Sequence, residues 1–159
     1  MKRNRVRSDL TRAFPSVVGE DARKAVAVLP ETRLAWTTFS VRVGGETVEI
    51  PYRIYHNPGK IDRASLTPLQ NEIVDCLLTR HHSGYVREKY LRGILARNGM
   101  WIPPFILQLV GEYVVEILQL IHRNIDSFDG STYGAFLVEN PEYVGFQLIS
   151  SFRKLQRPT

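Results

Sequence analysis

The hydrophobic pattern of this chain changes its period once, and that change constrains the fold more than any other feature. Within residues 36–55 the apolar side chains alternate, as they do along β-strands, and Gly44-Gly45 interrupts the alternation with a two-residue turn. Within residues 66–156 the apolar side chains recur every three or four positions, as they do on α-helices. The pattern therefore predicts a mainly α fold, a compact helical bundle of stacked helical hairpins with one N-terminal β-hairpin.

The size and composition of the chain are those of a single globular domain. It has 159 residues, of which 43% are hydrophobic and 23% charged, and a chain of this length buries about 70% of the surface that it exposes when unfolded. Its one cysteine, Cys76, has no second thiol to pair with, so the hydrophobic core alone must hold the fold, and a reducing cytoplasm suits it. We expect a flexible basic arm over residues 1–18 and one globular domain over residues 19–156.

The most apolar stretch covers residues 102–121 and is long enough to cross a bilayer. Four polar residues interrupt it at helical spacing, which places them on one narrow face: Gln108, Glu112, Glu116 and Gln119. With Pro103-Pro104 at its start, the stretch predicts one long helix to about residue 125, central in the bundle and apolar on three sides. The polar face predicts that Glu112 and Glu116 are solvated, and we expect no membrane partner.

A Tyr-Val pair begins three similar segments, at Tyr85, Tyr113 and Tyr143. The pairs are 28 and 30 residues apart, and periods of this size indicate stacked helical hairpins. The segments 80–91 and 139–145 resemble the turn and second helix of HEAT-like α-helical repeats, and the resemblance covers residues 67–156. The whole chain is also similar to uncharacterised bacterial proteins that carry comparable Tyr-Thr-Arg-His-His and Gly-Glu-Tyr-Val-Val segments. These resemblances imply stacked helix pairs and no particular activity.

The net charge of +5 belongs to the two ends of the chain. Residues 1–12 carry +4 and the last seven residues carry +3, which leaves −2 for the body between them. A slightly acidic body weighs against a basic folded surface, but the arm leaves nucleic-acid binding as the alternative function. In that alternative, residues 67–97 form a helix-turn-helix whose second helix enters a groove while the arm follows the phosphates. The residues that would contact nucleic acid are Arg3, Arg5, Arg7, Arg12, Arg87, Lys89 and Arg92.

Residue types that carry catalysis or bind metals are few and scattered in the sequence. His81 and His82 are adjacent at a predicted helix end, where side chains of this kind meet free backbone carbonyls. No His-x-x-x-His or Cys-x-x-Cys spacing occurs, and Cys76 lies among apolar residues that place it in the core. We therefore expect no catalytic residue, no metal and no cofactor, and the sequence offers no positive support for enzyme activity.

The sequence favours a non-catalytic protein-interaction or assembly module in the cytoplasm. The repeat, the missing catalytic constellation and the surplus apolar surface of the long helix point the same way. The expected partner is another protein or a second copy of the chain, which would make a homo-oligomer. It would bind the apolar helix surface or the edge of the hairpin.

Overall fold

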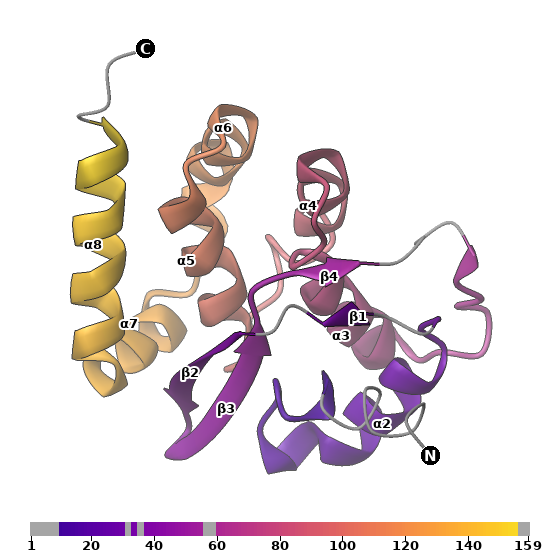
Figure 1. Ribbon diagram of the computed structural model, residues 1–159. Coiled ribbons are helices and arrows are strands. Elements are labelled where there is room, and N and C mark those ends of the chain that lie inside the picture. The colour runs from indigo at the N-terminus through magenta and orange to yellow at the C-terminus, as the bar shows by residue number, and fades with distance from the viewer. Residues whose placement is uncertain (1–9, 31–32, 35–36, 56–59, 156–159) are drawn as a thin grey trace.

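A computed structural model describes residues 10–30, 33–34, 37–55 and 60–155, and it confirms a mainly α chain with a β-hairpin (Figure 1). After the hairpin, helices that are neighbours in the sequence contact each other in pairs, and α5 also contacts α7 and α8. The repeat itself stays a prediction. The elements are the 3₁₀ helices η1 (Ser16–Val18) and η3 (Ile125–Ser127), the strands β1 (Arg33–Leu34), β2 (Thr38–Val43), β3 (Glu46–Pro51) and β4 (Ile54–Tyr55), and the helices α2 (Gly19–Ala27), α3 (Pro68–Leu78), α4 (Gly84–Leu91), α5 (Ile102–Glu112), α6 (Val115–Asn124), α7 (Gly130–Glu139) and α8 (Pro141–Leu155).

The predicted β-hairpin is present over residues 38–51. β2 and β3 pair antiparallel along their whole lengths, and the two residues of the turn, Gly44 and Gly45, have φ angles of 57° and 83°. Glycine suits the turn because these angles bring the Cβ of other residues against their own backbone. Exposed and buried residues alternate along β2, so one face of the hairpin joins the core.

The second strand ends earlier than the predicted hairpin, which extended to residue 55. The N–H that Pro51 lacks would point outward from β3, as that of Glu49 does, and one further bond, from the Tyr52 N–H to the Thr37 carbonyl at 3.3 Å, follows before the chain leaves the sheet. β4 then pairs with β1 instead of β2. The N–H of Ile54 donates to the Arg80 carbonyl at 2.8 Å, and its carbonyl accepts from the His82 N–H at 3.0 Å. The break in the strand therefore lies directly against the end of α3.

Residues 10–18, predicted as part of a flexible arm, are packed into the domain. Leu10, Phe14 and Val18 are buried, and the ring of Phe14 stacks on Phe105 of α5 with the ring centroids 5.5 Å apart. The carbonyl of Arg12 accepts from the N–H of Glu49 at 2.9 Å, which covers the outer edge of β3. The predicted arm is therefore too long, because these three apolar side chains find a place in the core. Residues 1–9 lie outside the described part of the chain.

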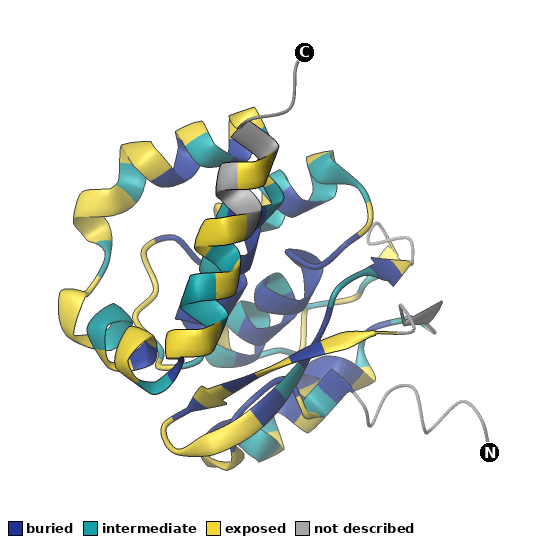
Figure 2. Cartoon of the chain, turned by 60° about the vertical axis from the view of Figure 1, so that its left-hand side comes forward, coloured by how far each residue is buried: buried dark blue, intermediate teal, exposed yellow. Residues whose placement is uncertain are grey.

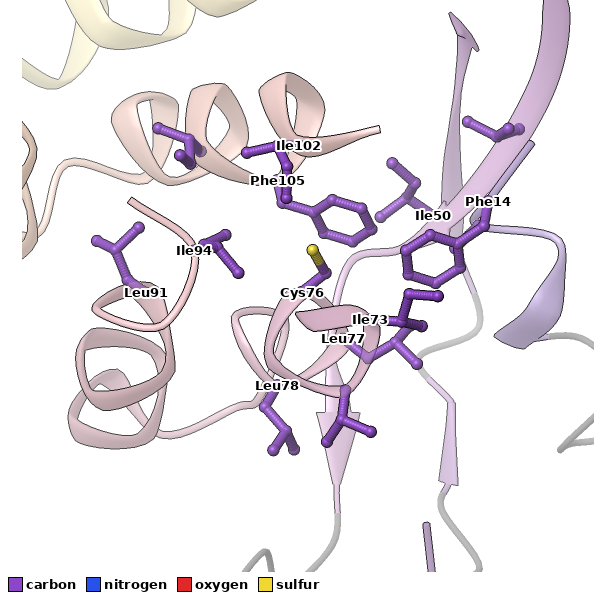
Figure 3. Packing of buried hydrophobic residues seen from close by; sticks show 14 of the residues in the cluster. Phe14, Ile50, Ile73, Cys76, Leu77, Leu78, Leu91, Ile94, Ile102 and Phe105 are labelled. Carbon is purple, nitrogen blue, oxygen red and sulfur yellow. The ribbon is translucent and has the colours of Figure 1, made fainter. Parts of the chain in front are cut away.

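A capping box fixes the start of α3. Thr67 and Gln70 make a capping box, in which each side chain accepts a hydrogen bond from the backbone N–H of the other residue. The helix buries its apolar face in the core beneath α5, and Figure 3 shows Cys76 among these side chains. Cys76 is thus a core residue, as predicted. Its burial raises the pKa of the thiol well above the usual value.

The prediction of one long helix after residue 102 is wrong, because the chain breaks it into α5 and α6. Tyr113 adopts a left-handed conformation with a φ of 55°, and Val114 is extended. The first half keeps the predicted central place, since α5 is largely buried and contacts α6, α7 and α8. In the described part of the chain, no helix has both the length and the apolar character needed to cross a membrane.

Candidate functional site

Arg80, two residues after the end of α3, is a fully buried charge. Its guanidinium donates from Nε to the Pro51 carbonyl at 3.2 Å and from Nη2 to the Tyr52 carbonyl at 2.7 Å. These two carbonyls belong to the break between β3 and β4, just before the chain turns from one strand into the other. Nη2 also donates to Glu112 of α5 at 2.7 Å. Arg80 therefore joins the strand break, the end of α3 and the end of α5.

Glu112, the last residue of α5, is surrounded by three arginines. Its Oε2 accepts from Arg80 Nη2 at 2.7 Å and from Arg53 Nη1 at 2.6 Å, and its Oε1 lies 3.8 Å from Arg87 Nε. We call Arg53, Arg80, Arg87 and Glu112 the Glu112 cluster. Three guanidinium groups and one carboxylate leave a charge of +2, and only Arg53 has more than a tenth of its side chain exposed.

The pKa shifts in the Glu112 cluster follow from burial and from these charges. Burial acts to raise the pKa of Glu112, but the attraction and hydrogen bonds of Arg80 and Arg53 outweigh it, so the pKa lies below the usual value. Burial lowers the pKa of Arg80 and of Arg87, and Glu112 opposes both shifts. Glu112 is therefore ionised at neutral pH and anchors the arginines, which is a structural role and not that of a general acid.

The predicted polar face of the long helix faces protein in α5, whereas its two residues in α6, Glu116 and Gln119, are exposed. Gln108 is buried, and its Oε1 accepts from the Tyr143 hydroxyl at 2.9 Å and from Gln147 Nε2 at 2.7 Å, both on α8. The prediction that Glu112 is solvated is wrong, because the three arginines cover it. The same prediction is confirmed for Glu116, which is exposed beyond the helix break.

A groove of about 600 Å³ separates β2 from the start of α8, and we call it the edge groove. Its lining includes Ser40, Arg42, Asn140, Glu142, Tyr143 and Phe146. Asn140 bridges the two sides, because its Oδ1 accepts from the Arg42 N–H at 2.7 Å and its Nδ2 donates to the Arg42 carbonyl at 2.8 Å. The side-chain amide of Asn140 thus makes the two backbone hydrogen bonds to Arg42 that a residue of a neighbouring strand would make.

The outer edge of β2 opens on this groove. Residues of β2 and β3 that face each other alternate between pairs that share hydrogen bonds and pairs that direct them outward. The Glu49 N–H points away from β2 to the Arg12 carbonyl, so its pair partner Ser40 directs its own N–H and carbonyl outward on the other side. Among the described residues, the backbone of Ser40 has no hydrogen-bond partner. β2 therefore presents a free edge next to the pair that Asn140 covers.

Five exposed apolar side chains lie on α7 and α8, the two helices that end the described chain. They are Leu137, Val138, Phe146, Leu148 and Ile149. Val138 is 82% exposed and Phe146 is 61% exposed, and Figure 2 shows exposed residues along both helices. Phe146 also lines the edge groove, so the apolar surface continues into it. Of the five, Phe146 is thus the exposed apolar side chain that a partner in the edge groove would contact.

Of the side chains predicted to contact nucleic acid, the structure describes four, and they do not share one surface: one is buried and three are exposed. Arg87 is buried in the Glu112 cluster, next to Glu112. The prediction that its side chain enters a groove of nucleic acid is therefore corrected. Lys89 is exposed on α4, Arg92 is exposed directly after it, and Arg12 is exposed beside β3. Arg3, Arg5 and Arg7 lie outside the described residues. Nucleic-acid binding itself stays a prediction.

The described residues contain no group of three histidine, cysteine, aspartate or glutamate side chains placed to hold a metal ion. No family model, curated protein or solved structure matches this chain. The candidate site therefore stands on its own geometry, which is a free strand edge beside an exposed apolar helix face.

Proposed function

We propose that this protein is a non-catalytic interaction module that binds an extended segment of a partner protein in the edge groove. The observation that carries the proposal is the free backbone edge at Ser40, set beside the exposed apolar face of α8. A segment that adds to a sheet edge gains affinity from main-chain hydrogen bonds and specificity from alternate side chains.

The groove also indicates the chemistry of the segment. Phe146 and Tyr143 line one side, so an apolar side chain of the segment would lie against them. Glu142 is exposed at the same side, whereas the carboxylate of Glu139 accepts from the N–H groups of Gly44 and Gly45 in the hairpin turn. The free carboxylate favours a basic residue close to the apolar one. The expected partner segment is therefore extended, with an apolar and a basic side chain near each other.

The edge at Ser40 can be tested with two substitutions at one position. Ser40→Pro removes the outward N–H and leaves the bonds between β2 and β3 in place, because proline is tolerated at such edge positions. Both variants lose the bond from Ser40 Oγ to the Glu49 carboxylate. Ser40→Ala keeps the backbone N–H, and Ser40→Pro does not. The pair isolates the backbone donor.

Peptides selected from a random display library on the intact chain would then be measured by fluorescence anisotropy. We expect the selected peptides to share an apolar and a basic residue. Their affinity for Ser40→Ala should equal that for the natural chain. Their affinity for Ser40→Pro should be at least about tenfold lower, a loss of about 1.4 kcal/mol in binding free energy. Equal binding to both variants, or no selected peptide, would contradict the proposal. The groove could instead be filled by a second copy of the chain, which light scattering tests. A dimer that Ser40→Pro dissociates would identify that occupant.

A further inference from the structure

The link between α4 and α5 carries an asparagine that is followed by a glycine, Asn98-Gly99. The two residues lie in irregular backbone, after the turns that follow α4 and before the start of α5 at Ile102. Asn98 is exposed and Gly99 is half-buried. The pair therefore lies at the surface, outside the helices and strands of the described chain.

The fold makes little use of the polar groups of this pair. Among the described residues, the side chain of Asn98 makes no hydrogen bond and the N–H of Gly99 has no acceptor. Only the Gly99 carbonyl is held, since it accepts from the Ile102 N–H at 3.0 Å at the start of α5. The Asn98 side chain is therefore free to rotate and to bring its Cγ toward the nitrogen of the next residue.

Glycine at position 99 leaves the approach to that nitrogen open. It has no Cβ to shield its N–H, and its backbone adopts conformations that other residues avoid. Packing requires glycine here for a separate reason, because a Cβ at this position would overlap the ring of Trp101. The contact with Trp101 thus keeps the least shielded residue directly after an exposed asparagine.

The other asparagines in the described part of the chain lack this combination. Asn71 accepts from Arg63 Nε at 2.7 Å, and Asn124 donates to a carbonyl one turn earlier in α6 at 2.8 Å. Both are followed by a residue with a large side chain. Asn140 precedes Pro141, whose nitrogen carries no hydrogen. An unheld amide beside an unshielded N–H therefore occurs at positions 98–99 and at none of these three.

We propose that Asn98 is a site of spontaneous modification, at which its amide becomes a carboxylate by way of a cyclic imide with Gly99. Asparagine is among the thermally labile residues. Hydroxide removes the proton of the Gly99 N–H, and the nitrogen attacks Cγ of Asn98. The new N–Cγ bond forms as the Cγ–Nδ2 bond breaks, and Nδ2 takes a proton from water and leaves as ammonia.

Water then opens the imide ring at either of its two carbonyl carbons. One opening gives aspartate, and the other gives isoaspartate, in which the main chain runs through the side-chain carbons. The overall reaction consumes one water and releases one ammonia, with no change of oxidation state. It requires no partner protein, so the inference is independent of peptide binding at the edge groove.

The modification changes a junction of the fold. The new carboxylate adds a negative charge, and isoaspartate also lengthens the main chain between positions 98 and 99. The residues that follow make close contacts, because Gly99 packs on Trp101 and Met100 Sδ lies 3.2 Å from the place that a Cβ on Gly44 would take. A longer main chain at position 98 therefore acts on the contact between this link and the hairpin turn.

The test incubates the intact chain for several days at mildly alkaline pH in water labelled with heavy oxygen. Proteolysis and mass spectrometry with electron-transfer fragmentation then locate the label and distinguish aspartate from isoaspartate. We expect both products at position 98, with isoaspartate in excess, and a rate that rises in proportion to hydroxide. The rate at Asn98 should be at least about tenfold that of any other described asparagine, a difference of about 1.4 kcal/mol in the activation barrier.

The products also distinguish this route from direct hydrolysis of the amide, which gives aspartate alone. No conversion at position 98, or aspartate without isoaspartate, would overturn the proposal. A peptide with the sequence of residues 96–101 measures what the folded link contributes. We expect the native chain to react no more than about tenfold more slowly than the peptide, because only the Gly99 carbonyl is held. A greater slowing would show that folding protects the pair and would refute the assignment.

Two matched substitutions locate the reacting amide. Asn98→Gln lengthens an exposed side chain by one methylene, so the imide ring would need one more atom, and conversion at position 98 should slow at least about tenfold. Asn124→Gln is the control and should leave the rate at Asn98 unchanged. Conversion of Asn98→Gln at the natural rate would contradict the imide with Gly99.

Discussion

Replacing Glu112 by glutamine should destabilise the fold more than any other change of a single carboxyl group in the described chain. The substitution keeps the shape of the side chain and removes only its charge. Arg80, which is fully buried, then loses its counter-ion, and the positive charge of the Glu112 cluster rises from +2 to +3.

Removing one partner from a buried ion pair costs about 3–5 kcal/mol, because the other charge stays buried without compensation. Arg80 keeps its bonds to the carbonyls of Pro51 and Tyr52, and the glutamine oxygen still accepts one bond. We therefore expect the lower end, a loss of about 3 kcal/mol in the free energy of unfolding. For a chain of this length that lowers Tm by about 6–12 °C.

The loss should depend on pH with a definite sign. The pKa of Glu112 is lower in the folded chain than in the unfolded chain. Its charge therefore stabilises the fold fully above about pH 4.3, the ordinary value for glutamate, and this contribution is lost as the pH falls through the lower folded pKa. The difference in stability between the natural chain and Glu112→Gln should shrink in acid.

Urea unfolding followed by circular dichroism at several pH values measures this difference. Glu116→Gln, four residues further on and exposed, is the matched control and should change stability by less than about 0.5 kcal/mol. A loss below about 1 kcal/mol for Glu112→Gln, the level of exposed ion pairs, would refute the view that the Glu112 cluster holds the strand break to the helices.

Three further predictions concern the contact between α5 and α8, the contact of Asn140 with β2, and the burial of Cys76. Gly111→Ala should cost about 1–2 kcal/mol in urea unfolding, because its Cβ would displace Gln147 of α8 from its bond to Gln108 of α5. The same change should stabilise by up to about 1 kcal/mol once Gln147→Ala has removed the clash. Asn140→Ala should cost about 2 kcal/mol and speed amide exchange at Arg42, since both of its bonds to that residue are lost. Cys76 should react with a thiol reagent only when the chain unfolds, because burial keeps it protonated, and rapid reaction of the native chain would contradict its place in the core.

Local signals in the sequence were sufficient for the elements that depend on neighbours along the chain. The turn at Gly44-Gly45 needs only two residues tolerant of positive φ, and the hairpin around it follows from the alternation of apolar residues along the chain. The core position of Cys76 follows from the apolar residues on its own helix. These features could be predicted because nothing distant competes with them.

The Glu112 cluster could not be predicted because its members are far apart in the sequence. A glutamate at helical spacing from other polar residues is typical of a solvated face. No residue near Glu112 in the sequence indicates that it pairs with Arg53 and Arg80. The helix break at Tyr113 has no proline or glycine at the breaking residue, so periodicity alone continued the helix. The free edge at Ser40 required the register of the hairpin and the contact of Asn140, which are tertiary facts.

Amide hydrogen exchange at Ser40 tests the proposed interface most directly. In the free chain its N–H points outward without a partner among the described residues, whereas the N–H of Val41 points toward β3. With a saturating selected peptide, we predict that exchange slows strongly at Ser40 and little at Val41, because only the outward N–H gains an acceptor. Unchanged exchange at Ser40 in the saturated complex would show that the partner binds elsewhere.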